Sequence, residues 1–263
     1  MNGWDMLVGS LFSLAISYGG YRAHSLTKSG AAAAFFVGCS IFLGFCWIGF
    51  LLLGAFFVSS SLLSKFKREK KKSVEQLLAK SDKRDYVQVL ANGGVPAVIS
   101  IFQVMAPSHI WFFLFSISLA AANSDTWASE VGTLSKGNPR MMFTLKQVER
   151  GTSGAVSLLG TLAGLSGSFF IAILALIVTD ITVLAFVLIM VFGFAGNLID
   201  TIIGGILQVK YLCSSCKKVT ENPVHCKVHG RKISGISIFN NDVVNFVSIV
   251  AAVIIGFGFS FKV

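Results

Sequence analysis

The sequence predicts an all-α polytopic membrane protein with about eight transmembrane helices, and three observations support this fold class. Of the 263 residues, 54% are hydrophobic and only 13% are charged, whereas a soluble domain carries roughly a quarter charged residues. The mean hydropathy is +0.75. Apolar runs of about 18 to 20 residues recur along the chain, and this is the length that crosses roughly 30 Å of hydrocarbon. The chain is therefore expected to have lipid as its solvent.

The apolar runs divide the chain into eight expected spans, and seven to nine would also be compatible with the pattern. Within 29–64 the letters "GFCWIG" predict either a tight turn between two spans or an irregular segment inside one helix. No separate polar domain interrupts the pattern, so residues 1–263 are expected to form a single transmembrane domain. The expected spans are 6–21, 29–44, 47–64, 89–105, 110–124, 154–178, 182–203 and 239–260.

The basic residues predict how these spans are oriented. Nineteen of the 22 Lys and Arg lie in three expected loops, at about 65–88, 124–153 and 204–238. Basic residues in short loops stay on the cytoplasmic side, so these loops share the cytoplasmic face and both termini lie on the extracytoplasmic side. The net charge of +10 is therefore topological and predicts no nucleic-acid partner. It would also attract anionic lipid headgroups or a nucleotide.

Four polar, glycine-rich clusters stand at the expected cytoplasmic ends of the spans. The orientation derived from Lys and Arg alone places all four on one membrane face. A carboxylate within a membrane helix is costly and by default faces a protein-lined or water-filled cavity, and Asp200 is the clearest case. The candidate residues are Asn92 in the first cluster; Asp125, Thr126, Glu130, Lys146, Arg150, Gly151, Thr152, Ser153 and Gly154 in the second; Asn197 and Asp200 in the third; and Asn241, Asp242 and Asn245 in the fourth.

The carboxylates and amides of these clusters suit Mg²⁺. This ion prefers one or two carboxylates, further oxygen ligands and substrate phosphates. Asn197 and Asp200 are three residues apart and share one helix face. Helix capping is the alternative role for Asn241 and Asp242. The expected Mg²⁺ ligands are Asp125, Glu130, Asp200 and Asp242.

The segment "GTSG", residues 151–154, is expected to open the 154–178 helix and to bind phosphate. A helix N-terminus presents free backbone N–H groups to an anion, and Lys146 and Arg150 would add positive charge. Close helix packing through small residues is the alternative role for the glycines. The expected nucleotide- or phosphate-binding residues are Asn92, Thr126, Arg150, Gly151, Thr152, Ser153, Gly154, Asn197, Asn241 and Asn245.

One loop, residues 213–229, has cysteine and histidine at the spacing of a metal knuckle. In "CSSCKKVTENPVHCKVH", Cys213, Cys216, Cys226 and His229 form C-x2-C-x9-C-x2-H, with His225 as a spare. These four residues could close a tetrahedral site for a structural Zn²⁺. Reduced thiols in a surface hairpin are the alternative, because a cytoplasmic loop disfavours disulfides.

Five motifs together resemble the integral-membrane family of domain of unknown function ninety-two, which includes a plant phytyl-phosphate kinase. They are "SDTWASEVG", "LKQVERGTSGAVSLLGTLAG", "GFAGNLIDTIIGGILQ", "YLCSSC…VHC" and "NNDVVNF". The resemblance implies a kinase that transfers phosphate from CTP to a prenyl monophosphate, of phytyl or geranylgeranyl type, to give the diphosphate. It also implies catalytic roles for Asp125, Glu130, Lys146 and Asp200.

The expected partners are a nucleoside triphosphate, a prenyl phosphate lipid and the bilayer. Alternative functions are a CTP-dependent lipid cytidylyltransferase, an ion-coupled transporter and a non-catalytic scaffold. The short chain without a transit peptide favours a prokaryotic cell membrane, with the active site on its cytoplasmic face. The sequence leaves the prenyl chain length and the oligomeric state open.

Overall fold

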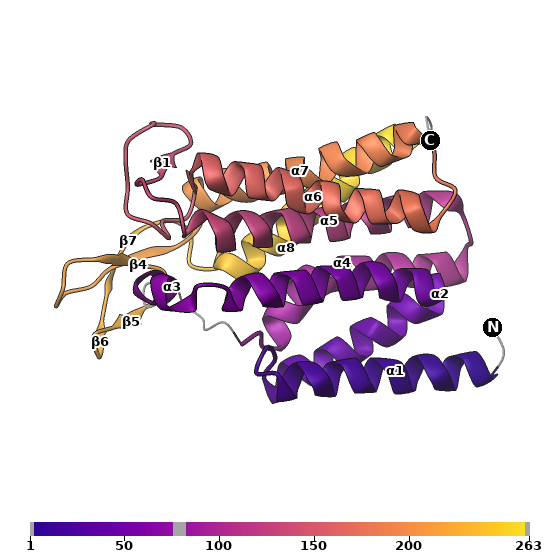
Figure 1. The fold of residues 1–263 in the computed structure, drawn as a ribbon. Coiled ribbons are helices and arrows are strands. Elements are labelled where there is room, and N and C mark those ends of the chain that lie inside the picture. Colours follow the sequence, from indigo (N-terminus) through magenta and orange to yellow (C-terminus); the bar gives the residue numbers. More distant parts are fainter. Residues whose placement is uncertain (1–2, 76–82, 261–263) are drawn as a thin grey trace.

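The computed structural model describes residues 3–75 and 83–260, and most of them are helical (Figure 1). Among the described residues, five helices are long and apolar enough to cross a membrane, namely α2, α4, α6, α7 and α8. The predicted class, a mostly helical membrane protein, is confirmed. The helices are α1 Gly3–Arg22, α2 Lys28–Lys65, α3 Arg68–Glu75, α4 Tyr86–Met105, α5 His109–Gly132, α6 Leu158–Val178, α7 Val183–Ile206 and α8 Asn241–Phe259.

Helix α2 is a hairpin of two helical arms, residues 28–45 and 47–65. Cys46 has φ 49° and ψ −138°, which are not helical angles. At about 1.5 Å per residue, a continuous helix of this length would separate its ends by about 57 Å. Instead, Lys65 Nζ donates a hydrogen bond to the carbonyl oxygen of Ala23, 2.7 Å away, just before the helix begins. The "GFCWIG" segment is therefore a tight turn.

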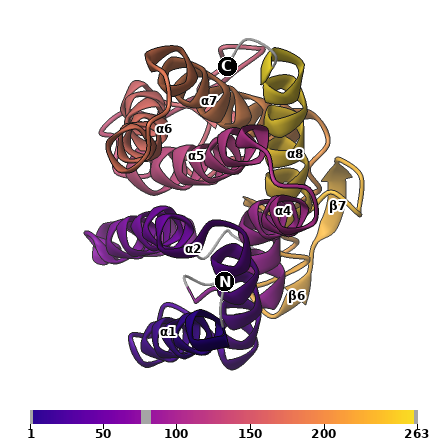
Figure 2. The ribbon, with the colours of Figure 1, turned by 90° about the vertical axis from the view of Figure 1, so that its right-hand side faces the viewer.

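Helix α5 is the centre of the fold. It contacts α2, α4, α6, α7 and α8, and Figure 2 shows it between the α6–α7 pair and the α2–α4 pair. Its polar residues also serve packing: Asn123 Nδ2 donates to the Gly167 carbonyl at 2.7 Å, and Ser124 Oγ donates to the Gly164 carbonyl at 2.8 Å. The glycines of α6 let the two backbones approach closely enough for these bonds.

Helix α5 also continues beyond its expected end at residue 124. It ends at Gly132, so Asp125, Thr126 and Glu130 stand on its last turns and not in the expected 124–153 loop. Thr126 Oγ1 donates to the Ala122 carbonyl at 2.8 Å, which satisfies this polar side chain within the helix. The predicted helix end at residue 124 was wrong, because a helical segment whose polar residues face a cavity resembles a loop in its amino-acid composition.

The "GTSG" segment does not open α6, and that prediction was wrong. Helix α6 begins at Leu158, and the side chain of Ser157 caps it by accepting a hydrogen bond from Gly160 N at 3.1 Å. Gly151 and Gly154 have φ of 83° and 81°, in the left-handed region that glycine adopts without strain. The segment is therefore a loop, and it leads into β2 (Ala155–Val156), which pairs antiparallel with β1 (Arg140–Met141).

Between α7 and α8 the chain forms short strands. The strands β3 (Lys210–Leu212), β4 (Val219–Thr220) and β7 (Arg231–Ser234) make a sheet in the order β4-β3-β7, while β5 (Val224–His225) and β6 (Val228–His229) make a hairpin. These strands, β1 and α3 all lie at one end of the helices, and the two termini lie at the other (Figure 1). The three basic segments therefore share one end of the molecule.

Candidate functional site

A cavity of about 390 Å³ opens at this end of the helices. Binding sites for small molecules and cofactors usually have volumes of about 300–1,000 Å³. Asn92 of α4, Asp125 of α5, Ser153 of the loop before β2, Asp200 of α7 and Asp242 of α8 all line it. The cavity therefore brings together residues from all four polar clusters, which are separated by up to 150 positions in the sequence.

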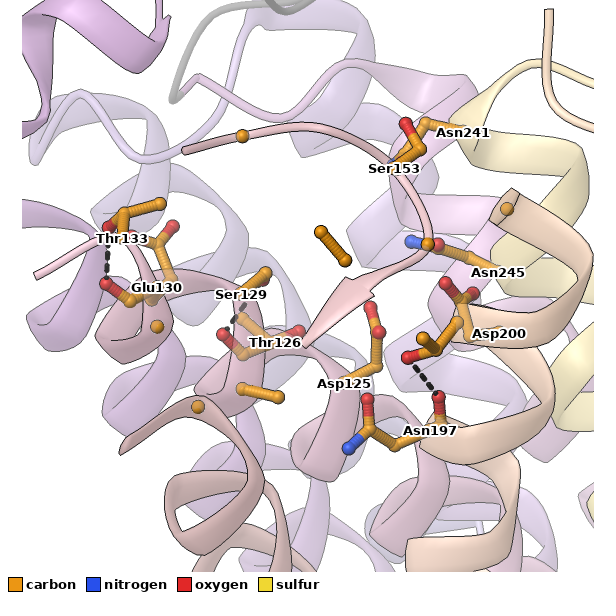
Figure 3. A pocket seen from close by; sticks show the side chains of 18 of the residues that line it. Asp125, Thr126, Ser129, Glu130, Thr133, Ser153, Asn197, Asp200, Asn241 and Asn245 are labelled. Atoms are coloured by element: carbon orange, nitrogen blue, oxygen red, sulfur yellow. Dashed lines mark hydrogen bonds between the residues drawn. The ribbon is translucent and has the colours of Figure 1, made fainter. Parts of the chain in front are cut away.

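One side of the cavity, formed by Asp125, Asp200 and Asp242, is called the carboxylate end below. Figure 3 shows Asp125 and Asp200 projecting toward one another from α5 and α7, with Asn197 beside them. Asp200 Oδ2 accepts a hydrogen bond from Ser248 Oγ at 3.2 Å. It also accepts one from Asn245 at 3.0 Å, in the amide orientation that satisfies both groups. These donors orient the carboxylate of Asp200 without supplying positive charge.

Asp125 has a different environment from Asp200. Over residues 3–75 and 83–260 no hydrogen bond or ion pair forms to its carboxylate. Two facing carboxylates with amide oxygens nearby form a donor set that fits a hard divalent cation. The carboxylate end can therefore hold Mg²⁺ through Asp125 and Asp200, with Asp242 also lining the cavity.

The opposite side of the cavity, formed by Lys71, Arg84 and Glu130, is called the cation end. Lys71 Nζ lies 2.6 Å from Glu130 Oε2, and Ser64 Oγ donates to Glu130 Oε1 at 2.6 Å. Both carboxylate oxygens of Glu130 therefore already have protein partners, and Figure 3 shows Glu130 well away from Asp200. Glu130, predicted from the sequence as a catalytic Mg²⁺ ligand, instead neutralises a lysine and ties α3 to α5.

The sequence analysis assigned no site role to Lys71 or Arg84, although Arg84 opens the first polar cluster. Lys71 belongs to the basic run before residue 76, yet it is only 3% exposed and also donates to the Leu63 carbonyl at 2.7 Å. A buried charge is tolerated only with a counter-charge and hydrogen bonds, which Glu130 and Leu63 provide. Arg84 donates from Nη1 to Ser61 Oγ at 3.0 Å. Ser61 and Ser64 are one helical turn apart, so the two cations lie along the same arm of α2.

Two other predicted cations have different positions. Arg150 lines the cavity and donates from Nη2 to the Lys136 carbonyl at 3.0 Å. Lys146 is exposed on the turn after β1, and it is not among the residues that line the cavity. Its predicted catalytic role is therefore not supported. The bridge between Arg140 and Gln147 closes this turn and holds Lys146 on the outside.

The loop of residues 151–154 forms one wall of the cavity. At Gly154 a Cβ atom would lie 2.2 Å from Gly205 Cα, so close packing of the two backbones requires glycine at this position. Ser153 donates a hydrogen bond to the carboxylate of Glu221, and Lys210 Nζ donates to the Ser153 carbonyl at 3.0 Å. Gly151, Thr152, Ser153 and Gly154 all line the cavity, although not as a helix N-terminus.

Glu221 is a further cavity residue that the sequence analysis missed. Burial raises the pKa of Glu221 above its ordinary value, while the Ser153 hydrogen bond and the charge of Lys210 act against this rise. Burial lowers the pKa of Lys210, and the charge of Glu221 acts against that. The only signal for Glu221 was its position inside the cysteine loop.

The remaining predicted residues line the cavity from α4, α5, α7 and α8. Helix α8 is capped by Asn240, whose Oδ1 accepts a hydrogen bond from Val243 N at 3.0 Å. The capping role considered for Asn241 and Asp242 therefore belongs to Asn240, and both of the later residues face the cavity. The residues in question are Asn92, Thr126, Asn197, Asn241, Asp242 and Asn245.

The cysteine loop brings four potential metal ligands together, but with a different histidine from the expected one. The ligand atoms of Cys213, Cys216, His225 and Cys226 lie within 4.8 Å of one another. His229 is outside this cluster, because the chain reverses at Cys226 and Lys227, with φ of 52° and 60°. This turn pairs β5 with β6 and leaves His225 next to the cysteines.

Comparisons with known proteins place this chain in a family. The model of an integral membrane protein family, DUF92, matches residues 11–253. Protein PGR of Arabidopsis thaliana is 33% identical over 93% of this chain and 92% of its own length. Protein VTE6, chloroplastic, also of Arabidopsis thaliana, is 33% identical over 85% of this chain and 62% of its own length.

An uncharacterised membrane protein of Methanocaldococcus jannaschii is 38% identical over 65% of this chain and 70% of its own length. The search of solved structures found no significant match. The family match extends over nearly the whole helical fold and includes every residue of the cavity named above. The chain belongs to the DUF92 family of integral membrane proteins.

Proposed function

We propose that this protein is a membrane-embedded kinase that transfers a phosphoryl group from CTP to a prenyl monophosphate and so makes the prenyl diphosphate. The observation that carries the proposal is one cavity with two chemically distinct ends, a carboxylate end and a cation end. The carboxylate end suits the metal of a nucleotide, and the cation end suits the phosphate of an acceptor. The family resemblance supports the choice of nucleotide and acceptor.

Phosphoryl transfer depends mostly on positioning and on electrostatic stabilisation. In the proposed reaction an oxygen of the acceptor phosphate attacks the γ-phosphorus, the bond from this phosphorus to the bridging oxygen breaks, and CDP leaves. A phosphate monoester is largely a dianion at neutral pH, because its second pKa is about 6. The acceptor therefore needs no strong general base, and no histidine of the described chain lines the cavity.

Asp125 and Asp200 would hold Mg²⁺. When bound, this ion would neutralise negative charge that develops on the nucleotide phosphates. Asn245 and Ser248 would keep the Asp200 carboxylate in position through the hydrogen bonds described above. Arg150 and the 151–154 loop would face the nucleotide phosphates. Arg84 would bind the acceptor phosphate, while Lys71 and Glu130 would hold the wall of the cavity beside it.

A second cavity, of about 80 Å³, is a candidate for the prenyl tail. It lies among α1, both arms of α2 and α4, and its lining includes Val37, Phe50 and Phe56. This apolar groove shares three lining residues, Arg84, Gln88 and Asn92, with the main cavity. An acceptor could therefore place its tail in the groove and its phosphate at the cation end.

The membrane topology is part of the same proposal. The two arms of α2, together with α1 and α4 to α8, would give eight spans, with both termini on the extracytoplasmic side. The basic residues near β1, β3 and α3 would then lie on the cytoplasmic face, where CTP is available. Cysteine labelling of exposed loop positions in intact cells measures this sidedness.

An activity assay on the purified protein tests the function. CTP, Mg²⁺ and geranylgeranyl phosphate are expected to yield CDP and the diphosphate in equal amounts, and the Lys146→Ala variant should retain full activity. Release of pyrophosphate would instead indicate a cytidylyltransferase. Substrate flux into sealed vesicles without nucleotide turnover would indicate a transporter. Either result would overturn the proposal.

A further inference from the structure

We propose that Cys213, Cys216, His225 and Cys226 bind a structural Zn²⁺ that holds one wall of the cavity in place. This site is separate from the carboxylate end and does not depend on which reaction the cavity catalyses. The proposal rests on the geometry of the four ligands, on the construction of the loop that carries them, and on the contacts between this loop and the cavity.

The four ligand atoms have nearly the spacing of a tetrahedral zinc site. With Zn–S of about 2.3 Å and Zn–N of about 2.0–2.1 Å, a sulfur and a nitrogen ligand lie about 3.5 Å apart and two sulfurs about 3.8 Å apart. His225 Nδ1 lies 3.4 Å from Cys216 Sγ and 3.3 Å from Cys226 Sγ. All four ligand atoms lie within 4.8 Å of one another.

The backbone of the loop is folded to converge on this point. Lys217 N donates to the Cys213 carbonyl at 3.0 Å, and Cys213 N donates to the Lys218 carbonyl at 2.9 Å. These bonds close the Cys213–Cys216 knuckle, with Lys217 at φ 59°. The second turn, at Cys226, has φ 52° and presents a thiol and an imidazole from adjacent residues. Three non-glycine residues of the loop have left-handed backbone conformations, namely Lys217, Cys226 and Lys227. Such conformations are strained unless the surrounding structure holds them.

The chemistry of the ligand set selects zinc over the alternatives. Cys213, Cys216 and Cys226 form no disulfide in the described chain, and a disulfide between two of these three would leave the third sulfur and the imidazole unused. Three thiolates and one imidazole in a tetrahedral arrangement are typical of structural zinc. Four protein ligands leave no open position for a substrate, so the site is structural.

The loop has little else to hold it together. Its strands are two to four residues long, and every residue of β7 is exposed. Cys213 and Thr220, at 0% and 2% exposed, are its two buried residues between 211 and 234. So small a core cannot offset the entropy of ordering the chain. Metal binding supplies folding free energy in small domains of this kind.

The same loop supplies two contacts to the cavity. Glu221 follows β4 and accepts the hydrogen bond of Ser153, while Lys210 begins β3 and donates to the Ser153 carbonyl. Both contacts hold the 151–154 loop, which lines the cavity. If zinc orders the strands, it also keeps Ser153 and its neighbours in position. Loss of zinc is therefore expected to loosen the cavity wall without removing any residue of the carboxylate end.

Metal analysis of the purified protein tests the site directly, whatever the protein's activity. We expect about one zinc ion per chain, and after exchange a Co²⁺ form with the absorption of tetrahedral thiolate coordination. Cys216→Ser and Cys226→Ser should lose the metal, while Cys39→Ser, a cysteine outside the loop, should retain it. Absence of zinc from the wild-type protein, with no Co²⁺ thiolate absorption, would overturn the proposal.

The two histidines distinguish this ligand set from the one expected from spacing. His225→Ala should lower zinc content several-fold, and His229→Ala should leave it unchanged. The opposite pattern would reject the ligand set. Limited proteolysis measures the structural consequence: after removal of zinc by a chelator, cleavage within 210–234 should become faster while the long helices stay intact. Equal cleavage with and without zinc would overturn the proposed role in holding the wall.

Discussion

The carboxylates at the two ends of the cavity differ in whether a positively charged side chain pairs with them. At the cation end, Glu130 is neutralised by Lys71 and accepts a further hydrogen bond from Ser64. At the carboxylate end, Asp125 and Asp200 face one another, and the donors to Asp200 are the uncharged side chains of Ser248 and Asn245. A buried charge needs a counter-charge. The protein supplies its own at one end, and a bound cation would supply it at the other.

The largest expected effect follows from removing a carboxylate that lacks a protein partner. Asp125→Asn keeps the shape but loses the charge, so it should weaken Mg²⁺ binding and lower turnover by about 100-fold or more, because a metal ion contributes several kcal/mol to the transition state. A steady-state assay across Mg²⁺ concentrations measures this. The matched control is Asp180→Asn, an exposed carboxylate between α6 and α7. Full turnover in Asp125→Asn would remove the carboxylate end from the mechanism.

The second largest effect is a loss of stability when the ion pair at the cation end is broken. Glu130→Gln leaves Lys71 buried without its counter-charge, which should lower the free energy of unfolding by about 3 kcal/mol. Thermal unfolding in detergent measures the change. Replacing both partners, in Lys71→Met with Glu130→Leu, should recover most of the stability, because no buried charge remains. If Glu130→Gln unfolds like the wild type and instead loses Mg²⁺ dependence, Glu130 is a metal ligand after all.

A smaller effect tests whether the cation end receives the prenyl phosphate from the groove. Gly54 lines the groove, and a Cβ added there meets no atom within 4 Å, so the larger side chain of Gly54→Leu should occupy part of the groove. The KM for a long prenyl phosphate should rise by about 10-fold, since about 1–3 kcal/mol is typical for a blocked apolar contact. A short prenyl phosphate should be affected less.

The matched control for the groove is Gly94→Leu, at a position with equal room that does not line the groove. If Gly54→Leu raises the KM equally for long and short prenyl phosphates, the tail does not bind in the groove. The same conclusion follows if Gly94→Leu raises the KM for the long acceptor as much as Gly54→Leu does.

The smallest effect concerns the pH dependence of stability at the cavity wall. Burial raises the pKa of Glu221 above its ordinary value of 4.5, so the folded protein holds this proton more tightly than the unfolded chain. Its contribution to stability is therefore complete below that value and is lost as pH rises through the raised pKa. The Tm of the wild type relative to Glu221→Gln should therefore fall as the pH rises above 4.5. Glu149→Gln, at an exposed position, should show no such trend.

The residues that could be predicted from the sequence are those whose role is visible along one stretch of chain. Apolar runs of membrane length identified the helices, and the Lys and Arg pattern placed Asn92, Asp125, Asp200 and Asp242 at one end. Their convergence on one cavity needed only that the helix ends be neighbours. The C-x2-C spacing likewise identified the cysteine loop, since a knuckle is a local structure.

The tertiary structure alone decided which of the polar residues are available for chemistry. Glu130 and Asp125 look alike in "SDTWASE", yet one has a buried lysine beside it and the other has none. Lys71 and Lys146 are likewise both lysines, but only Lys71 lines the cavity. Of the two histidines, only His225 lies with the cysteines. Residue type and spacing define what a side chain can do, but its partners come from other helices and turns. Charge pairing is a property of distance in space, so only the folded chain determines it.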